Sequence, residues 1–315
     1  MNRRHFLAAA AVASTACSTM PEPEPAIPII DTHIHLFDPS RPEGVPWPPA
    51  DDPVKYKTAL PPRYRQLTES LGIVGAIEIE CSPWFDDNQW VLDVAEGDTI
   101  MVGTVGNLEP ANPEFQAQLE RFSSNPLFRG IRYGNLWDSN IRTQLDKPEF
   151  VEGLRALSAQ GLSLDTANPT VELLEDMVRV TDLVPDLRVI IDHLPKIVVP
   201  AGQEAAYENA LKELAGRPRV FVKVSAVLLE NEGKVAYELE PYRETLDHIW
   251  DTFGEDRLLY GSDWPNSDSW GSYEQVLSVV REYFSGKSRE AQEKYFWRNS
   301  VRAYGWVKRA PNQPA

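Results

Sequence analysis

The stretch "IIDTHIHLFDP" (residues 29–39) places two histidines two positions apart at the end of an apolar run. Successive side chains of a β-strand point to opposite faces, so the stretch predicts Asp31, His33 and His35 on one face. Imidazoles on one strand face can hold a metal ion or a substrate oxygen. The alternative is a polar strand end whose histidines hydrogen-bond to nearby loops, and the motif alone leaves both interpretations open.

Outward from this stretch, apolar runs of strand length recur with segments of helical spacing between them, such as "EFVEGLRALSAQG" (149–161). Eight alternations of strand and helix predict an α/β fold, a (β/α)8 TIM barrel, as a single domain over residues 29–315. A doubly wound open sheet would require a glycine-rich phosphate turn after the first strand, and the sequence has none there. The expected strands cover residues 28–35, 76–81, 100–107, 128–133, 162–167, 188–193, 220–226 and 258–264.

Polar residues gather at the ends of these apolar runs. In a barrel of this kind, the carboxyl ends of the strands form the active-site face. A buried polar group without a partner costs about 1–3 kcal/mol, so several of them at one rim should form a network. Any one of them could be structural, but their convergence indicates chemistry. They are His33, His35, Glu80, Asn107, Arg132, Asp165, His193, Lys223 and Asp263.

Five motifs together resemble the amidohydrolase superfamily, and within it the lactonase-like branch that includes fuconolactonase, rhamnonolactonase and pyrone-dicarboxylate lactonase. They are "DTHIHLFDP", "FRGIRY", "VIIDHLPK", "VFVKVSA" and "RLLYGSDWP", and the resemblance runs from about Ile29 to "NSVRAYGW". The first motif is weak alone, but its combination with DH on the sixth strand and GSDWP on the eighth is specific. The resemblance implies a barrel hydrolase.

The resemblance also implies catalytic roles for four residues. His33 and His35 correspond to the first-strand pair, His193 to the sixth-strand histidine, and Asp263 to the eighth-strand aspartate that activates water as a general base. Two imidazoles and a carboxylate, from His33, His35 and Asp263, suit at most one divalent ion such as Zn²⁺. No lysine stands where binuclear relatives carry a bridging one, and related lactonases work without a divalent metal.

Four charged residues are candidates for binding substrate. The resemblance implies that Arg132 and Lys223 hold substrate oxygens. Glu80 could be a metal ligand, a hydrogen-bond acceptor or the ion-pair partner of Arg132, and we favour the ion pair because opposite charges stabilise each other's ionised form. Asp165 could contact substrate or support a cation.

The loop after the first strand, 38–53, carries six prolines among its sixteen residues, together with Trp47. Trp47 could cover the substrate as a lid or pack on the barrel. Aromatic walls at a barrel mouth suit a sugar-derived or cyclic small molecule. We therefore predict a hydrolase that opens a lactone or similar cyclic ester with base-activated water. The alternatives are a metal-dependent decarboxylase of the same superfamily and a non-catalytic lipoprotein that binds a small molecule.

The N-terminus predicts an exported protein. Residues 1–16 contain Arg3 and Arg4 before a short apolar run and resemble a twin-arginine signal. Cleavage would leave Cys17 open to a lipid at the start of an extended linker, 17–28, so we expect a periplasmic protein or a membrane-anchored lipoprotein. A net charge of -16 and a pI of about 4.8 argue against nucleic acid and anionic lipid as partners.

Overall fold

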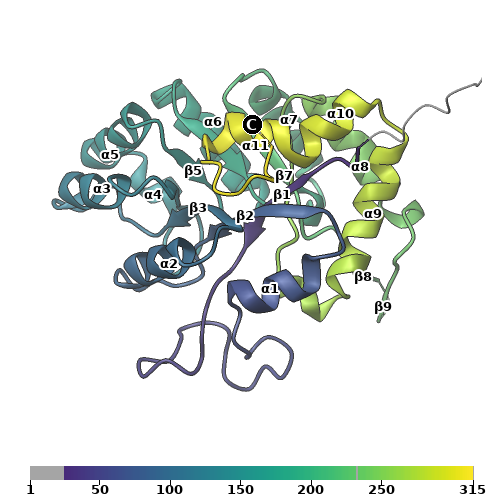
Figure 1. The fold of residues 1–315 in the computed structure, drawn as a ribbon. Helices are drawn as coiled ribbons and strands as arrows, with labels where there is room; N and C mark the ends of the chain where they lie inside the picture. Colours follow the sequence, from purple (N-terminus) through teal and green to yellow (C-terminus); the bar gives the residue numbers. More distant parts are fainter. Residues whose placement is uncertain (1–24, 232, 315) are drawn as a thin grey trace, which may run out of the picture.

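Eight parallel strands form one sheet that curves into a nearly closed barrel (Figure 1). The computed structural model describes residues 25–231 and 233–314. Neighbouring strands follow the chain in the order β1-β2-β3-β4-β5-β6-β7-β10, which confirms the predicted (β/α)8 barrel. The strands are β1 Ile29–Ile34, β2 Ile73–Ile79, β3 Met101–Gly106, β4 Phe128–Arg132, β5 Ser163–Asp165, β6 Arg188–Ile191, β7 Val220–Val224 and β10 Leu258–Tyr260.

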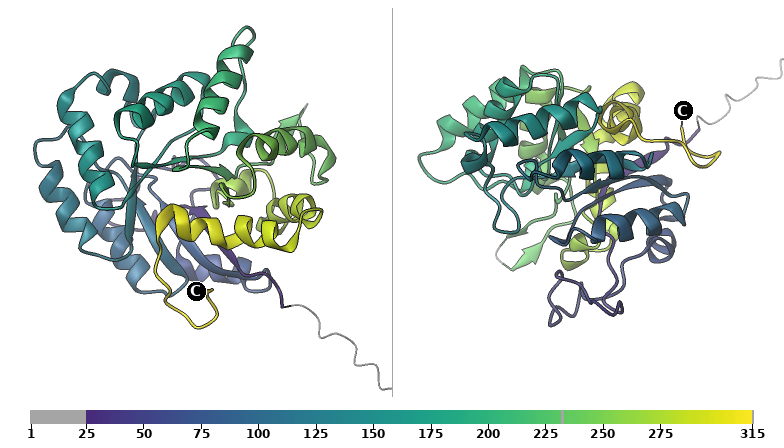
Figure 2. Two further views of the ribbon diagram at one scale, coloured as in Figure 1. Left: turned by 90° about the horizontal axis from the view of Figure 1, so that it is seen from above. Right: turned by 90° about the vertical axis from the view of Figure 1, so that its left-hand side faces the viewer.

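Helices surround the strands, and Figure 2 shows this ring from above. Each long helix buries one apolar face. Helix α9 (Tyr273–Ser285) begins with a capping box, in which the side chains of Ser272 and Gln275 each accept a hydrogen bond from the other residue's backbone amide. The helices are α1 Pro61–Thr68, α2 Asp87–Glu96, α3 Phe115–Ser123, α4 Ile141–Gln144, α5 Pro148–Ala159, α6 Val171–Leu183, α7 Glu204–Ala215, α8 Glu240–Phe253, α9 Tyr273–Ser285, α10 Arg289–Glu293 and α11 Asn299–Tyr304. A short hairpin of β8 Glu230–Asn231 and β9 Lys234–Val235 follows β7.

The barrel closes where β10 meets β1. Ile34 and Trp264 form an isolated parallel bridge, and the His35 amide donates to the Trp264 carbonyl oxygen at 2.8 Å. The Asp263 amide donates to the His33 carbonyl oxygen at 2.9 Å. The backbone bonds that close the barrel therefore also fix three of the predicted site residues relative to one another.

Two buried apolar clusters hold the fold together. The larger lies between the strands and the helices. The smaller contains residues from several strands, such as Ile30, Val102 and Leu259, together with Tyr304 and Trp306 from the C-terminal segment. In Figure 1, α11 lies at the top of the barrel and the loop 35–60 at the bottom, so the C-terminal segment covers the end opposite that loop.

The alternation expected for the first strand is wrong at Asp31. The register of β1 against β2 shifts between Asp31 and Ile34, which interrupts the strict alternation of faces. The Asp31 carboxylate accepts hydrogen bonds from the hydroxyls of Tyr64 on α1 and Tyr273 on α9, at 2.9 and 2.8 Å. Asp31 thus faces the outer helices and does not share a face with His33 and His35.

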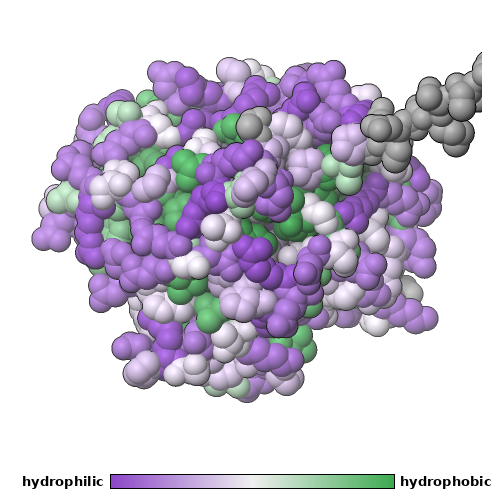
Figure 3. Space-filling view, viewed as in Figure 1, coloured by the Kyte–Doolittle hydropathy of each residue, from purple (hydrophilic) through white to green (hydrophobic). Residues whose placement is uncertain are grey.

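The predicted signal 1–16, Cys17 and the linker as far as residue 24 lie outside the described residues. Among the helices that the structure describes, none has the length and apolar character needed to cross a membrane. Hydrophilic side chains predominate on the face drawn in Figure 3, with hydrophobic residues scattered among them.

Candidate active site at the barrel mouth

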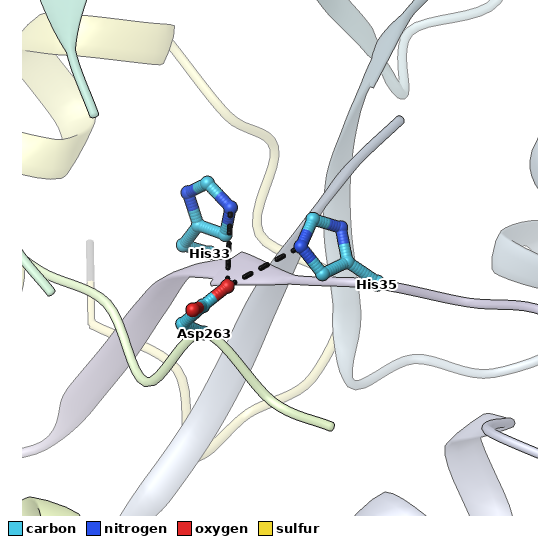
Figure 4. Close-up of side chains that lie close together, drawn as sticks. All are labelled: His33, His35 and Asp263. Atoms are coloured by element: carbon cyan, nitrogen blue, oxygen red, sulfur yellow. Dashed lines mark ion pairs between the residues drawn. The ribbon is translucent and has the colours of Figure 1, made fainter. Parts of the chain in front are cut away.

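Three imidazoles converge on one carboxylate oxygen. The Nε2 atoms of His35, His193 and His33 lie 3.3, 3.7 and 3.8 Å from Asp263 Oδ1. Figure 4 shows His33 and His35 approaching this oxygen from the first strand. The Asp263 Oδ2 atom accepts a hydrogen bond from the Asn266 side-chain amide at 3.2 Å. The four predicted catalytic residues are therefore brought together.

Unusual backbone conformations aim two of these side chains. His193 and Asp263 have φ angles of 53° and 61° and so lie in the left-handed region, which costs a non-glycine residue about 1–2 kcal/mol. Each follows the end of a barrel strand, where such a turn redirects the side chain across the mouth. Gly261 makes the approach of β10 possible, because a Cβ there would lie 2.8 Å from the His33 Cβ.

Each histidine has a different partner on its Nδ1 atom. His35 Nδ1 lies 2.7 Å from the Ile79 carbonyl oxygen, and His193 Nδ1 lies 2.8 Å from Ser225 Oγ. His33 Nδ1 lies 3.2 Å from Lys223 Nζ. These contacts fix the orientations of the rings, and they also decide which ring nitrogen carries the proton.

Burial dominates the ionisation of the histidines. It lowers the pKa of His33 and of His193 well below the usual histidine value, so both are neutral at neutral pH. Burial alone would raise the pKa of Asp263, but nearby positive charge and the interaction with His35 hold that pKa below its usual value. Asp263 is therefore ionised at neutral pH.

The donors at the mouth fit one metal ion. One atom each from His33, His35 and Asp263 lies within 4.8 Å of the others, and two ligands at about 2.0–2.1 Å from a tetrahedral Zn²⁺ lie about 3.3 Å apart. The buried atoms His33 Nε2 and Asp263 Oδ1 have no hydrogen-bond partner among the described residues. A divalent ion or a water molecule would satisfy both.

In a second group of potential ligands, His33, Asp192 and His193, the donor atoms also lie within 4.8 Å of one another. Lys223 Nζ, however, lies 2.9 Å from Asp192 Oδ1 and 3.2 Å from His33 Nδ1. An ammonium group therefore already sits where a cation would contact these two ligands. This arrangement favours at most one metal ion.

A charged network lies beneath the histidines. The Lys223 side chain is completely buried and donates to Asp165 Oδ2 at 2.8 Å. Asp165 also accepts from Ser163 Oγ at 2.9 Å and from the Tyr304 hydroxyl at 2.5 Å. Since neither Lys223 nor Asp165 lines the cavity at the mouth, the predicted substrate contacts of both are replaced by a supporting role. For Asp165, this is the second of the two predicted alternatives, the support of a cation.

Asp192 is a site residue that is absent from the predicted set. It is fully buried, and its carboxylate lies 2.9 Å from Lys223 Nζ, 3.4 Å from Arg132 Nε and 3.6 Å from His33 Nδ1. The signal was present in the sequence, because an aspartate stands directly before His193 in the apolar run "RVIIDH".

The predicted ion pair of Glu80 and Arg132 is not formed as a direct contact between the two side chains, although the charge of Arg132 opposes the rise that burial causes in the pKa of Glu80. The Glu80 carboxylate accepts instead from Trp137 Nε1 at 3.0 Å and from the Ser82 amide at 3.1 Å, because the turn after β2 folds it back onto its own chain. Arg132 Nη1 contacts only the main-chain oxygen of Glu80, at 3.4 Å, and Arg132 Nε donates to the Thr166 carbonyl oxygen at 2.9 Å.

Above Asp263 lies a cavity of about 230 Å³. Trp47 lines it and also packs edge-on against His35, with ring centroids 5.7 Å apart. The predicted packing of Trp47 on the barrel is therefore present, at a position from which the ring also reaches the substrate space. The other lining residues are His35, Cys81, Arg132, Leu136, Trp137, Asn168, His193, Asp263 and Asn266.

Comparison with known proteins identifies the family. The amidohydrolase family model matches residues 30–306. The chain is 29% identical to the L-fucono-1,5-lactonase of Burkholderia ambifaria over 239 residues, covering 76% of this chain and 80% of that protein. It is 25% identical to the 4-sulfomuconolactone hydrolase of Rhizobium radiobacter over 244 residues, covering 75% of each.

Solved structures agree in fold. The crystal structure of an amidohydrolase from Burkholderia multivorans with bound zinc has a TM-score of 0.76 to this chain at 24% identity, and the match covers 89% of this chain and 100% of that one. The match of the family model over residues 30–306 makes the protein a member of the amidohydrolase family.

Proposed function

We propose that the protein is a lactonase, an enzyme that opens a small cyclic ester by attack of water. The observation that carries the proposal is the ionised, buried Asp263, whose Oδ1 atom has no hydrogen-bond partner among the described residues and borders the cavity. A carboxylate placed in this way can accept a proton from a water molecule in the cavity. Two of the relatives, an L-fucono-1,5-lactonase and a 4-sulfomuconolactone hydrolase, are named for this chemistry and support the proposal.

The reaction uses Asp263 twice. Asp263 Oδ1 takes a proton from water while the water oxygen attacks the lactone carbonyl carbon, and the Asn266 amide holds Oδ2 in place during the transfer. The carbonyl oxygen becomes an oxyanion, and His193 and Arg132 line the cavity as hydrogen-bond donors for it or for peripheral oxygens. When the ring C–O bond breaks, the proton held by Asp263 is returned to the leaving alkoxide.

A bound zinc ion would polarise the carbonyl group and make the attacking water more acidic. The chain's own candidate ligands for such an ion are His33, His35 and Asp263. The proton transfers assigned to Asp263 and the hydrogen bonds of Asn266, His193 and Arg132 are the part of the chemistry that the protein side chains supply.

The cavity favours an uncharged, sugar-derived lactone over a dicarboxylated ring. Its walls combine Trp47 and Trp137 with the amides of Asn168 and Asn266, groups that suit a polyhydroxylated ring. Arg132 is the one basic residue among the lining residues, and its Nε already lies 3.4 Å from Asp192 Oδ2. A dianionic substrate would require more positive charge than this cavity offers.

A substrate panel tests the proposal. Purified protein is assayed with 1,5-lactones and 1,4-lactones of L-fuconate, L-rhamnonate and D-galactonate, and with 2-pyrone-4,6-dicarboxylate, by following acid release and identifying the product. We expect turnover of at least one aldonolactone, and its loss in Asp263→Asn. Asp146→Asn, the same change at an exposed aspartate, should keep full activity. Turnover of the pyrone alone would refute the substrate class, and release of CO2 would favour the decarboxylase alternative.

We further propose that residues 1–16 direct export by the twin-arginine route and that Cys17 is the candidate site of a lipid. The sequence features that support this are Arg3 and Arg4 followed by an apolar run. The protein would then act in the periplasm or at a membrane surface.

A further inference from the structure

The Glu80 carboxylate lies next to the substrate cavity without lining it. Glu80 directly follows β2 and is 7% exposed, and it is not among the residues that line the cavity of about 230 Å³. Its Oε2 atom accepts two hydrogen bonds, from Trp137 Nε1 at 3.0 Å and from the Ser82 amide at 3.1 Å. The Glu80 amide donates to the Val105 carbonyl oxygen at 2.9 Å, which fixes the backbone. Glu80 is therefore a fixed acceptor, and its partner Trp137 lines the cavity.

Trp137 occupies a turn that its residue type does not favour. Trp137 and Asp138 have φ angles of 55° and 60°, and the Ser139 amide donates to the Leu136 carbonyl oxygen at 2.9 Å. Two central residues with positive φ and a hydrogen bond of this kind are the pattern of a type I′ turn, whose central positions are mostly glycine, asparagine or aspartate. A tryptophan at the first central position is strained, and the surrounding contacts must offset this strain.

Packing alone does not fix the Trp137 ring. Trp137 lines the substrate cavity and also a smaller cavity of about 10 Å³, which Glu80 lines as well. Among the described residues, Trp137 has no aromatic or cation–π contact. The other tryptophan of the substrate cavity, Trp47, packs against the rings of His35 and Phe37, with centroids 5.7 and 5.5 Å away. The hydrogen bond to Glu80 is therefore the directional contact that orients Trp137.

We propose that Glu80 is a positioning residue that fixes the Trp137 indole as a wall of the substrate cavity, and that its acceptor oxygen, not its charge, performs this role. One oxygen receives both hydrogen bonds, and the oxygen of a side-chain amide can accept the same two. A fixed indole offers a large, rigid surface to a cyclic substrate. The inference rests on the proposed function only in treating this cavity as the place where a lactone binds.

Two other roles of Glu80 predict different outcomes. If the charge of Glu80 served Arg132 or a proton transfer, Glu80→Gln would be as harmful as Glu80→Leu. If Glu80 contacted the substrate directly, its replacement would act independently of Trp137, and the effects of the two substitutions would multiply.

Four variants separate these roles. Glu80→Gln keeps an acceptor oxygen, Glu80→Leu removes it, and Trp137→Phe keeps an aromatic ring without the donor. Glu109→Leu is the matched control. Glu109 also accepts from an aromatic side chain, the Tyr133 hydroxyl at 2.8 Å, and from the amide two residues along, that of Ala111 at 3.2 Å. Tyr133, however, does not line the substrate cavity.

Hydrogen exchange of the Trp137 indole N–H tests the contact without a substrate. The indole resonances are observed by NMR of protein labelled with ¹⁵N-tryptophan, and that of Trp137 is assigned by its absence in Trp137→Phe. We expect exchange about 10-fold or more faster in Glu80→Leu than in the wild type, and within about threefold of the wild type in Glu80→Gln and Glu109→Leu. A wild-type Trp137 indole that exchanges as fast as free tryptophan would overturn the inference, whether or not any variant folds.

Steady-state kinetics test the consequence, with the aldonolactone of the panel above that is hydrolysed fastest. Glu80→Leu should raise KM about 3- to 10-fold and change kcat by less than about twofold, because binding of the ring is weakened and proton transfer is not. Glu80→Gln and Glu109→Leu should keep the wild-type KM. In the Trp137→Phe background, Glu80→Leu should raise KM no further, because its effect acts through the indole.

Circular dichroism identifies the variants that are folded. An unchanged KM in folded Glu80→Leu would overturn the inference, as would a Glu80→Gln variant that behaves like Glu80→Leu. A further rise in KM when Glu80→Leu is added to Trp137→Phe would also overturn it, because Glu80 would then act apart from the indole. If no lactone is hydrolysed while indole exchange is as expected, the proposed function fails and the positioning of Trp137 by Glu80 stands.

Discussion

Tyr304 and Asp165 are joined by a 2.5 Å hydrogen bond across 139 positions of the chain. The Tyr304 hydroxyl, at the end of α11, donates to the Oδ2 atom that also receives Lys223 Nζ at 2.8 Å. The C-terminal helix therefore contributes directly to the charged network beneath the active-site histidines. A single phenol links the segment that covers the far end of the barrel to the groups that orient His33.

Tyr304→Phe should lower the free energy of unfolding by about 1–3 kcal/mol, because it removes one hydrogen-bond donor from a buried carboxylate. Urea denaturation followed by circular dichroism measures this change. Tyr237→Phe removes a hydroxyl that donates to the Trp270 carbonyl oxygen at 3.1 Å on an exposed side chain, and it should change stability by less than about 0.5 kcal/mol. Equal effects of the two substitutions would show that the buried hydrogen bond contributes little.

Asp263→Asn should reduce turnover by about 10²–10⁴-fold with little change in folding, because the amide keeps the shape of the side chain and loses its basicity. Steady-state kinetics on the lactone found in the substrate panel, with thermal unfolding as the folding check, provide the measurement. Activity close to that of the wild type would remove Asp263 from the mechanism.

The pH profile should retain activity well below neutral pH. The pKa of Asp263 is lowered relative to an ordinary aspartate, so the carboxylate stays ionised as the pH falls into the usual aspartate range, and the base is lost only below that range. The contribution of Asp263 to the free energy of unfolding has the same pH dependence. It is fully present above the unfolded-state pKa and is lost as the pH falls through the lower folded-state pKa. The logarithm of kcat/KM measured against pH shows where the acidic limb lies. An acidic limb between pH 6 and 7 would instead indicate a histidine as the base.

The barrel and most of the candidate site could be predicted because both depend on local pattern. Apolar runs separated by helical segments determine the topology, and polar residues at the carboxyl ends of parallel strands must meet at one rim. This argument alone predicts that His35, His193 and Asp263 lie close together. The same argument predicts the correct strand for Lys223. Sequence position does not show, however, how deeply a side chain lies in the barrel, and the completely buried Lys223 side chain does not line the cavity.

The errors arose where the backbone departs from regular strand geometry. The register shift in β1 turned Asp31 outward toward Tyr64. Simple alternation places Asp192 and His193 on opposite faces, whereas the left-handed conformation of His193 (φ 53°) lets both reach His33. A left-handed residue that is not glycine leaves no clear mark in a sequence.

Export should depend on the arginine pair. Replacement of Arg3 and Arg4 by lysines should leave a folded, uncleaved precursor in the cytoplasm, because the export receptor reads the arginine pair. Cell fractionation followed by immunoblotting, with Lys308→Arg at the other end of the chain as a control for expression, measures this. Efficient export of the double-lysine form through the general secretory route would refute the twin-arginine assignment.

The metal content should lie between zero and one ion per chain. One donor set, from His33, His35 and Asp263, has the spacing for a single divalent ion, and Lys223 Nζ lies among the atoms of the other set, 2.9 Å from Asp192 Oδ1. A second cation at that place would face the ammonium group at close range, where two positive charges repel each other strongly in a buried environment. Elemental analysis after mild purification, and again after incubation with Zn²⁺ and desalting, gives the stoichiometry.

His35→Gln should abolish retention of the ion, whereas His248→Gln, at a half-exposed histidine paired with Glu208 far from these ligands, should not. Two tightly bound ions per chain would require Lys223 to leave Asp192, and would contradict the arrangement described above.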